Sequence, residues 1–272
     1  MTTLTAKLAR LRELLREMDG AAVAFSAGVD STFLLRVAHE ELGGRVVAVT
    51  VRSPLIPCLE LEDAAAFCRQ EDIRHAFIDF DALSVPAVAA NPPDRCYHCK
   101  REIFGRIVAF AKANGCAAVA EGSNTDDDGD YRPGQRAIRE LGIRSPLREA
   151  GLSKEEIRAL SREMGLPTWN KPSFACLASR IPYGEPLTAE ALERVERAER
   201  WLHDAELGLA QLRVRAHGNL ARIEVPPSDI PRLATRADEI AAAFKGFGFA
   251  YVTLDLQGYR TGSLNETLSE GK

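Results

Sequence analysis

The segment SAGVDS at residues 26–31 combines small and polar residues in a pattern suited to binding a phosphate group. It follows an apolar run at residues 21–25 and opens a stretch with helical periodicity. A turn between a strand and a helix start directs several backbone N–H groups at one point, where the helix dipole also favours negative charge. The segment matches neither the Walker loop nor the dinucleotide fingerprint. We therefore predict a phosphate site formed by Ser26, Gly28, Val29, Asp30 and Ser31.

The same hexapeptide resembles the PP-loop of ATP pyrophosphatases, which is usually written Ser-Gly-Gly-X-Asp-Ser. In that superfamily ATP is cleaved between its α and β phosphates, and a substrate oxygen is adenylated. Ala27 replaces the first glycine, so this position needs a backbone conformation that alanine tolerates. Taken alone, the segment is also consistent with a strand-to-helix turn whose small residues serve packing.

A second polar turn, GSNTDDD at residues 122–128, follows another apolar run at residues 117–120. Its amides and hydroxyls suit a ribose or a phosphate, and its carboxylates suit Mg²⁺ held through water. Asp30 is a second candidate for Mg²⁺, although a carboxylate there also complements the helix N-terminus without any metal. An acidic turn after a strand is usually solvated, so the functional prediction for this turn depends on the phosphate site predicted at residues 26–31. We predict nucleotide contacts from Gly122, Ser123, Asn124 and Asp127.

Cys96 and Cys99 form a CxxC motif. Zinc would need four ligands, and no second CxxC or paired histidines exist, although Cys58, Cys68 or Cys116 could contribute after folding. The alternative is that both cysteines pack at the start of a helix. The basic flanks of the motif are predicted to contact ATP phosphates: Arg95 and Lys100.

Cys176 lies in the run KPSFACLASRIPYG at residues 171–184, which has the character of a loop rather than of a periodic core segment. Arg180 follows four residues later. Loops carry reactive groups more often than cores do, and nearby positive charge favours the nucleophilic thiolate. We predict Cys176 as the catalytic nucleophile, with a buried inert thiol as the alternative.

The composition describes a globular chain with reduced cysteines. The chain has 272 residues, of which 46% are hydrophobic, so it buries a core without disulfides. Its six cysteines lack framework spacing. With no membrane-length apolar run and no signal-peptide pattern, we expect a cytosolic protein that does not bind membranes. A net charge of -4 argues against extensive nucleic-acid binding.

Apolar runs alternate with helical patterns in the first part of the chain, which predicts an α/β fold with a parallel sheet. The expected strands are 21–25, 46–51, 76–80 and 117–120, and the expected helices are 30–41, 59–70 and 100–114, with an amphipathic helix before them and a capping box at Ser153. Ligands bind beyond the carboxyl ends of such strands. Residues 167–186 form the expected linker and functional loop. We predict a nucleotide domain at 1–180 and a smaller α/β domain at 181–272.

The second domain is expected to contain helices at 188–203 and 228–244, a hairpin of strands 212–216 and 220–225, and a last strand at 249–254. Alternation places Arg213 and Arg215 on one face of the hairpin, and Arg222 and Glu224 share a face of its second strand. If the register joins these faces, they form a cationic patch. Arginine suits phosphate because its planar group donates two hydrogen bonds at once, although a solvated face is the alternative.

Together, these segments and the tail at residues 254–265 resemble the LarE family of ATP-dependent sacrificial sulfur transferases over nearly the whole chain. The resemblance implies that ATP and Mg²⁺ adenylate a carboxylate of pyridinium-3,5-biscarboxylic acid mononucleotide. Cys176 then attacks the activated carbonyl, gives up its sulfur and becomes dehydroalanine. The resemblance also implies a homo-oligomer and a carboxylate that supports a metal, which would be Glu224. It further implies a site for the substrate phosphate, in which Ser179 and Arg180 would also orient the loop; the residues of this site would be Arg213, Arg215, Ser179 and Arg180.

Several alternatives stay open at this point. Some members of the family are thought to carry a replaceable sulfide on an iron-sulfur cluster held by three cysteines, and Cys96 and Cys99 would be the pair to test. The sacrificial route is favoured because no second cysteine lies near Cys176 in the sequence. A PP-loop transfer RNA thiolase, a nucleotide-binding regulator without turnover, and an amide-forming ligase are the other functions considered.

Overall fold

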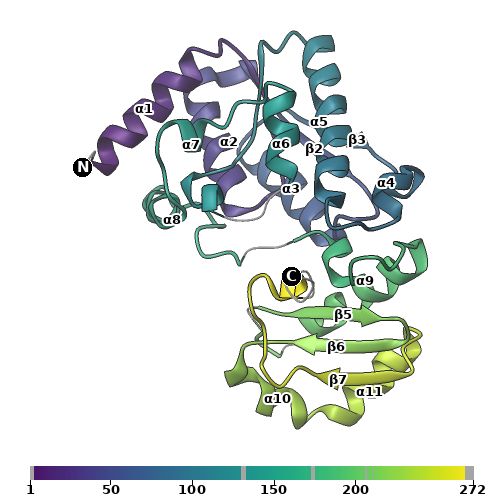
Figure 1. Cartoon of the computed structure of the whole chain (residues 1–272). Helices are drawn as coiled ribbons and strands as arrows, with labels where there is room; N and C mark the ends of the chain where they lie inside the picture. The colour runs from purple at the N-terminus through teal and green to yellow at the C-terminus, as the bar shows by residue number, and fades with distance from the viewer. Residues whose placement is uncertain (1–2, 130–132, 173–174, 206, 210, 267–272) are drawn as a thin grey trace. The chain divides into compact units, whose positions relative to one another are not determined.

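The structure is a computed structural model of the chain, and it describes residues 3–129, 133–172, 175–205, 207–209 and 211–266. Two compact units are present (Figure 1). The first unit comprises residues 1–80 and 94–174, and the second comprises 81–93 and 175–272. Residues 81–93 therefore group with the second unit, and the chain passes between units just before Cys176. The division into independent domains at residue 180 stays a prediction.

The first unit alternates strands with helices. Its strands are β1 (Ala21–Ala24), β2 (Val46–Arg52), β3 (His75–Asp79) and β4 (Ala118–Ala120). Its helices are α1 (Leu4–Arg16), α2 (Val29–Leu42), α3 (Cys58–Gln70), α5 (Arg95–Ala113), α6 (Gly134–Glu140), α7 (Pro146–Glu149) and α8 (Lys154–Glu163), with 3-10 turns η1 (Gly43–Arg45) and η3 (Thr125–Gly129).

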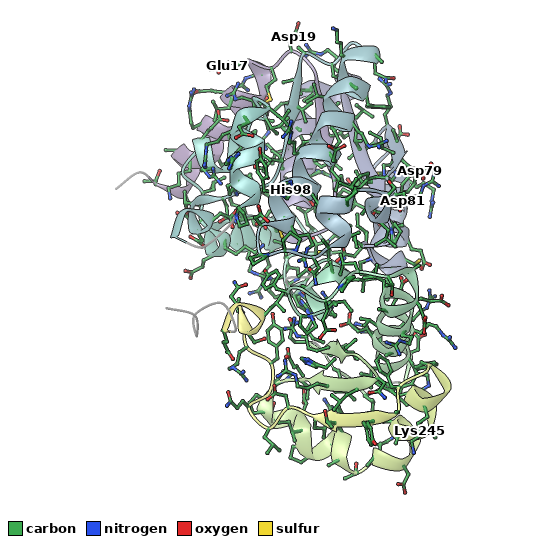
Figure 2. The ribbon with its side chains drawn as sticks, turned by 45° about the vertical axis from the view of Figure 1, so that its right-hand side comes forward. Glu17, Asp19, Asp79, Asp81, His98 and Lys245 are labelled. Atoms are coloured by element: carbon green, nitrogen blue, oxygen red, sulfur yellow. The ribbon has the colours of Figure 1, made fainter. Side chains whose placement is uncertain are left out.

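The four strands form a parallel sheet in the order β3-β2-β1-β4, as the sequence predicts. All of β2 except Arg52 is buried, which is the pattern of a parallel strand covered on both faces. Arg52 pairs with Asp79 at 2.8 Å, and Figure 2 shows Asp79 among the surface side chains. From β1 the chain adds β2 and β3 on one side of β1 and later adds β4 on the other side, so the strand order reverses between β1 and β4. Ligands bind at such a switch point in open α/β sheets.

Helix boundaries in the first unit follow local signals. Ser153 caps α8 through a capping box with Glu156, which confirms the sequence prediction. Gly28 is the N-cap of α2 and supplies no side-chain hydrogen bond, so the first N–H groups of α2 have no intrahelical or capping acceptor. The apolar faces of α1, α2 and α8 pack into one core with β1 and β2.

The second unit contains a three-stranded sheet in the order β5-β6-β7, formed by β5 (Arg213–His217), β6 (Leu220–Glu224) and β7 (Tyr251–Leu254). β5 and β6 form the predicted antiparallel hairpin, and β7 pairs parallel to β6. The remaining elements are α4 (Pro86–Ala89), α9 (Ala189–Asp204), α10 (Ile230–Ala234) and α11 (Ala237–Gly246), with 3-10 turns η2 (Ala82–Ser84), η4 (Leu177–Arg180), η5 (Pro227–Asp229) and η6 (Ser263–Asn265).

The prediction of one helix over residues 228–244 is wrong. The segment is split into η5, α10 and α11, with a turn at Thr235 and Arg236. The hydroxyl of Thr235 donates to the carbonyl of Arg232 at 2.7 Å, and the amide of Arg236 donates to the carbonyl of Leu233 at 3.0 Å. Such local bonds compete with the i to i−4 ladder and end the helix.

Across the described parts of the chain, no helix combines the length and the apolar character that a membrane crossing requires.

Candidate functional site

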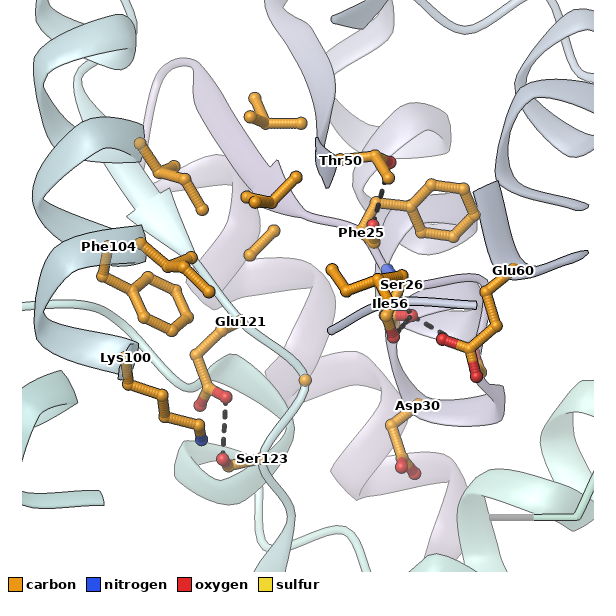
Figure 3. Close-up of a pocket in the computed structure, with 18 of the residues that line it drawn as sticks. Phe25, Ser26, Asp30, Thr50, Ile56, Glu60, Lys100, Phe104, Glu121 and Ser123 are labelled. Carbon is orange, nitrogen blue, oxygen red and sulfur yellow. Dashed lines mark hydrogen bonds between the residues drawn. The ribbon is translucent and has the colours of Figure 1, made fainter. Parts of the chain in front are cut away.

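A cavity of about 460 Å³ opens at the carboxyl ends of β1, β2 and β4 in the first unit (Figure 3). The loop after β1 and the turn after β4 supply polar groups, among them Ser26, Asp30, Ser123 and Asp127. The end of β2 and the helix α5 supply mostly apolar side chains. A cavity of this size with one apolar wall and a few convergent polar groups is typical of a small-molecule site.

The loop after β1 is closed by its two serines. The hydroxyls of Ser26 and Ser31 lie 3.1 Å apart, the backbone amide of Ser26 donates to the Ser31 hydroxyl at 3.3 Å, and that hydroxyl donates to the Gly28 carbonyl at 3.2 Å. The first backbone N–H groups of α2 follow directly. Their arrangement at the positive end of the α2 dipole suits an anion, as the sequence predicts for this loop.

Ala27 adopts φ +54°, in the left-handed region. Alanine rarely enters this region, whereas glycine does so freely. The PP-loop pattern has glycine at this position, so the structure gives the physical reason for that glycine. Ala27 is buried, which keeps its methyl group out of solvent.

Gly122 brings the turn after β4 against the first turn of α2. A methyl group at Gly122 would lie 3.0 Å from the backbone nitrogen of Ser31 and 3.2 Å from the carbonyl carbon of Asp30. The two predicted nucleotide-binding segments therefore share one backbone contact, at the switch point of the sheet.

The buried carboxylate of Glu121 organises this turn. It accepts hydrogen bonds from Ser123 at 2.8 Å and from Ser145, and Gln135 donates to the Ser123 hydroxyl at 2.9 Å. In Figure 3, Lys100 points toward Glu121 and Ser123. The sequence prediction omitted Glu121, although its place at the end of an apolar run before Gly122 was a usable signal.

Asp30 faces the cavity and forms an ion pair with Lys154 at the start of α8. Asn124 donates to the other oxygen of Asp30 at 3.3 Å, and the backbone amide of Asn124 donates to Asp127 at 3.0 Å. Three predicted residues therefore form a connected set. Lys154 was not predicted, because it lies 124 residues from Asp30 in the sequence.

The CxxC motif lies on the first turns of α5, and Cys96 and Cys99 are half-buried. Lys100 lines the cavity, whereas Arg95 is buried, with 2% of its surface exposed. Within residues 3–129, 133–172, 175–205, 207–209 and 211–266, no three His, Cys, Asp or Glu side chains are grouped for metal binding. Burial raises the pKa of the Cys68 thiol to about 12, so this residue does not suit thiolate chemistry.

Cys176 is half-buried and directly precedes η4 in the second unit. Its carbonyl accepts hydrogen bonds from the Ser179 hydroxyl at 2.9 Å and from Arg180 at 3.0 Å, and Arg180 also donates to the Ala175 carbonyl. The guanidinium of Arg180 is fully buried and makes a two-pronged pair with Glu199 at 2.8 and 2.9 Å. The backbone around the thiol is thus fixed by a buried ion pair.

The hairpin register brings the predicted arginine faces together, with Arg215 opposite Arg222 and Arg213 opposite Glu224. The carboxylate of Glu224 is fully buried and pairs with Arg215 at 2.9 Å and Arg222 at 3.1 Å. Arg215 also donates to the carbonyl of Ser179. Arg213, Arg215 and Glu224 are therefore part of a buried network joined to the Cys176 loop, whereas Arg222 is partly exposed.

Burial lowers the pKa of Arg213, and the nearby charge of Arg180 lowers it further, although Glu199 opposes this. Three buried guanidiniums, those of Arg180, Arg213 and Arg215, face two buried carboxylates, those of Glu199 and Glu224. Guanidinium groups are suited to an anionic ligand such as a phosphate. The assignments of a substrate phosphate to this cluster and of a metal to Glu224 stay predictions.

No protein-family model matches the chain. An uncharacterized protein of Synechocystis is 46% identical over 269 residues, which cover 98% of this chain and all of the relative. Pyridinium-3,5-bisthiocarboxylic acid mononucleotide synthase of Lactiplantibacillus plantarum is 38% identical over 273 residues, covering 100% of this chain and 98% of the relative. Argininosuccinate synthase of Natronomonas pharaonis is 30% identical over 163 residues, covering 56% of this chain and 40% of that enzyme.

Proposed function

The chain belongs to the family of pyridinium-3,5-bisthiocarboxylic acid mononucleotide synthases, the LarE family, and from this premise we propose that it uses ATP to insert sulfur into pyridinium-3,5-biscarboxylic acid mononucleotide. The full-length similarity to the synthase is the observation that carries the proposal. The partial similarity to argininosuccinate synthase, an ATP-using enzyme, supports the nucleotide part.

The first unit would bind ATP. The N–H groups at the start of α2 and the loop hydroxyls of Ser26 and Ser31 suit its phosphates, with Lys100 adding positive charge, and the apolar wall beside β2 suits the adenine. Asp30 and Asp127 line the same cavity, so they fit a Mg²⁺ ion completed by water and nucleotide phosphates. When bound, Mg²⁺ would offset the negative charge of the phosphates.

Adenylation replaces a poor leaving group on the substrate carboxylate with AMP and releases pyrophosphate. The Cys176 thiolate then attacks the activated carbonyl carbon, a thioester forms and AMP leaves. Removal of the Cα proton and cleavage of the Cβ–S bond leave dehydroalanine in the protein and a thiocarboxylate on the product. Each chain would therefore supply one sulfur atom.

The second unit would position the substrate and the thiol. Arg180 and Ser179 fix the Cys176 carbonyl, and the guanidinium groups of Arg213 and Arg215 suit the substrate phosphate. A homo-oligomeric state and a cytosolic location remain parts of this proposal.

Intact-mass measurement after incubation with ATP, Mg²⁺ and the substrate tests the function. We expect loss of one sulfur and two hydrogens at position 176, with formation of AMP, pyrophosphate and thiocarboxylate. Cys176→Ala should still release pyrophosphate but form no thiocarboxylate. An unchanged mass of the wild-type protein alongside thiocarboxylate formation would reject the sacrificial route, and iron and sulfide assays on anaerobically purified protein would then test the cluster route.

A further inference from the structure

Lys171 joins the segment that leads to Cys176 to the phosphate loop. Its ammonium group donates to the carbonyl of Ala27 at 3.1 Å and pairs with Asp63 of α3 at 2.7 Å. The side chain is 18% exposed, although Asp63 is 59% exposed. All of these contacts lie within the first unit.

The backbone of Lys171 is held as well. Arg158 of α8 donates to the carbonyl of Lys171 at 2.8 Å and to the carbonyl of Trp169 at 2.7 Å. The backbone is thus attached to α8 while the side chain reaches the phosphate loop. This double attachment fixes Lys171 itself, from which the chain continues to Cys176.

Four residues separate Lys171 from Cys176, and the five Cα–Cα steps between them cover at most ~18 Å when the chain is fully extended. Fixing one end of so short a segment limits the volume that the thiol explores. A smaller volume raises the effective concentration of the thiol at a reacting group bound beside the phosphate loop.

We propose that Lys171 is a positioning residue for sulfur transfer, which ties the segment carrying Cys176 to the loop that binds ATP. This inference rests on the proposed function, because it assigns the step that follows adenylation. In this role Lys171 holds the backbone of the segment in place and does not itself react with the sulfur. Its pair with Asp63 adds little to overall stability, because exposed pairs contribute weakly.

Single-turnover kinetics of three variants test the inference through two rates: pyrophosphate release and loss of sulfur from Cys176. Lys171→Met removes both contacts, Lys171→Arg keeps the charge, and Asp63→Asn weakens only the ion pair. We expect Lys171→Met to slow sulfur loss at least tenfold while pyrophosphate release changes less than threefold. Lys171→Arg should recover part of the sulfur-loss rate, and Asp63→Asn should leave both rates within threefold of wild type.

The inference is overturned if Lys171→Met slows both rates in parallel, or if it slows neither. Should this variant not fold, Lys171→Gln gives the same test, because its neutral side chain, one bond shorter than that of lysine, loses both the ion pair with Asp63 and the reach to the Ala27 carbonyl. Failure of the proposed function has a different signature, since the wild-type protein itself would then lose no sulfur. In that case the proposed role of Lys171 in sulfur transfer is rejected together with the proposed function.

Discussion

Gly122 and Ser31 meet backbone to backbone: a methyl group added to Gly122 would lie 3.0 Å from the Ser31 nitrogen. The turn after β4 and the start of α2 are therefore too close for a methyl group to fit at Gly122 unless one of them shifts. The contact sets the width of the cavity on its polar side, where both segments supply lining residues.

Gly122→Ala should consequently weaken ATP binding. The added methyl group forces the turn or the first turn of α2 to move, and overpacking of this kind costs about 1–3 kcal/mol. We expect a lower melting temperature and a roughly tenfold weaker ATP affinity, about 1.4 kcal/mol, measured by calorimetry. Gly105→Ala is the matched control, because within the described part of the chain no atom beyond the adjacent backbone of its own helix lies within 4 Å of its added methyl group. Equal effects of the two substitutions would contradict the role given to the contact.

Ala27→Gly should stabilise the phosphate loop. The left-handed conformation at φ +54° costs an alanine about 1 kcal/mol, whereas glycine adopts it without strain. The greater freedom of glycine in the unfolded chain offsets part of this gain, so the expected net change is a stabilisation of less than about 1 kcal/mol. Urea unfolding measures it. A clear destabilisation would show that the alanine methyl group contributes packing that outweighs the strain.

Local sequence signals predicted the architecture because the fold uses them directly. The apolar run before SAGVDS became β1, and the capping box at Ser153 starts α8. Alternation in the hairpin predicted which faces carry the arginines, and the register of the structure places Arg215 opposite Arg222. Each of these features depends on residues close in the sequence, where periodicity and capping decide the conformation.

Individual side-chain contacts between distant residues could not be predicted. Lys154 and Lys171 meet the phosphate loop from more than one hundred residues away, and their charges alone do not indicate a partner. Glu199 was likewise not predicted, although its buried carboxylate pairs with Arg180, which the sequence analysis assigned to the substrate phosphate. Burial of charge depends on tertiary packing, so a single sequence does not specify it.

Asp30→Asn should reduce the Mg²⁺ dependence of adenylation. The substitution removes the negative charge that faces the cavity and leaves Lys154 without its ionic partner. We expect pyrophosphate release to fall at least ~100-fold, the scale of a lost electrostatic contact in an active site. Titration of the rate with Mg²⁺ should also show a weaker apparent affinity. Asp79→Asn, at an exposed pair with Arg52, is the control and should behave like wild type. An Asp30→Asn enzyme with an unchanged Mg²⁺ titration would exclude this carboxylate as a ligand.

Glu199→Gln should destabilise the second unit and change its response to acid. Burial alone raises the pKa of Glu199, but the charge and hydrogen bonds of Arg180 outweigh it, so the pKa is lowered. A carboxyl group whose pKa is lower in the folded state than in the unfolded state stabilises the fold at pH values above its unfolded pKa of about 4.3. This contribution is lost as the pH falls through the pKa of the folded state. The glutamine variant lacks this titration and leaves the buried Arg180 charge uncompensated, which costs about 3–5 kcal/mol at neutral pH.

Urea unfolding between pH 7 and pH 3 measures this effect. Trp201 lies on α9 in the second unit, and Trp169→Phe removes the other tryptophan, so fluorescence then reports on the second unit alone. The wild-type stability should decrease as the pH falls below about 4.3, whereas the Glu199→Gln variant should be less stable throughout and lose less on acidification. Glu239→Gln removes a pair with Arg236 at the protein surface and should leave the unfolding curve nearly unchanged. If Glu199→Gln and wild type lost the same stability between pH 5 and pH 3, the acid response would have to come from other carboxyl groups.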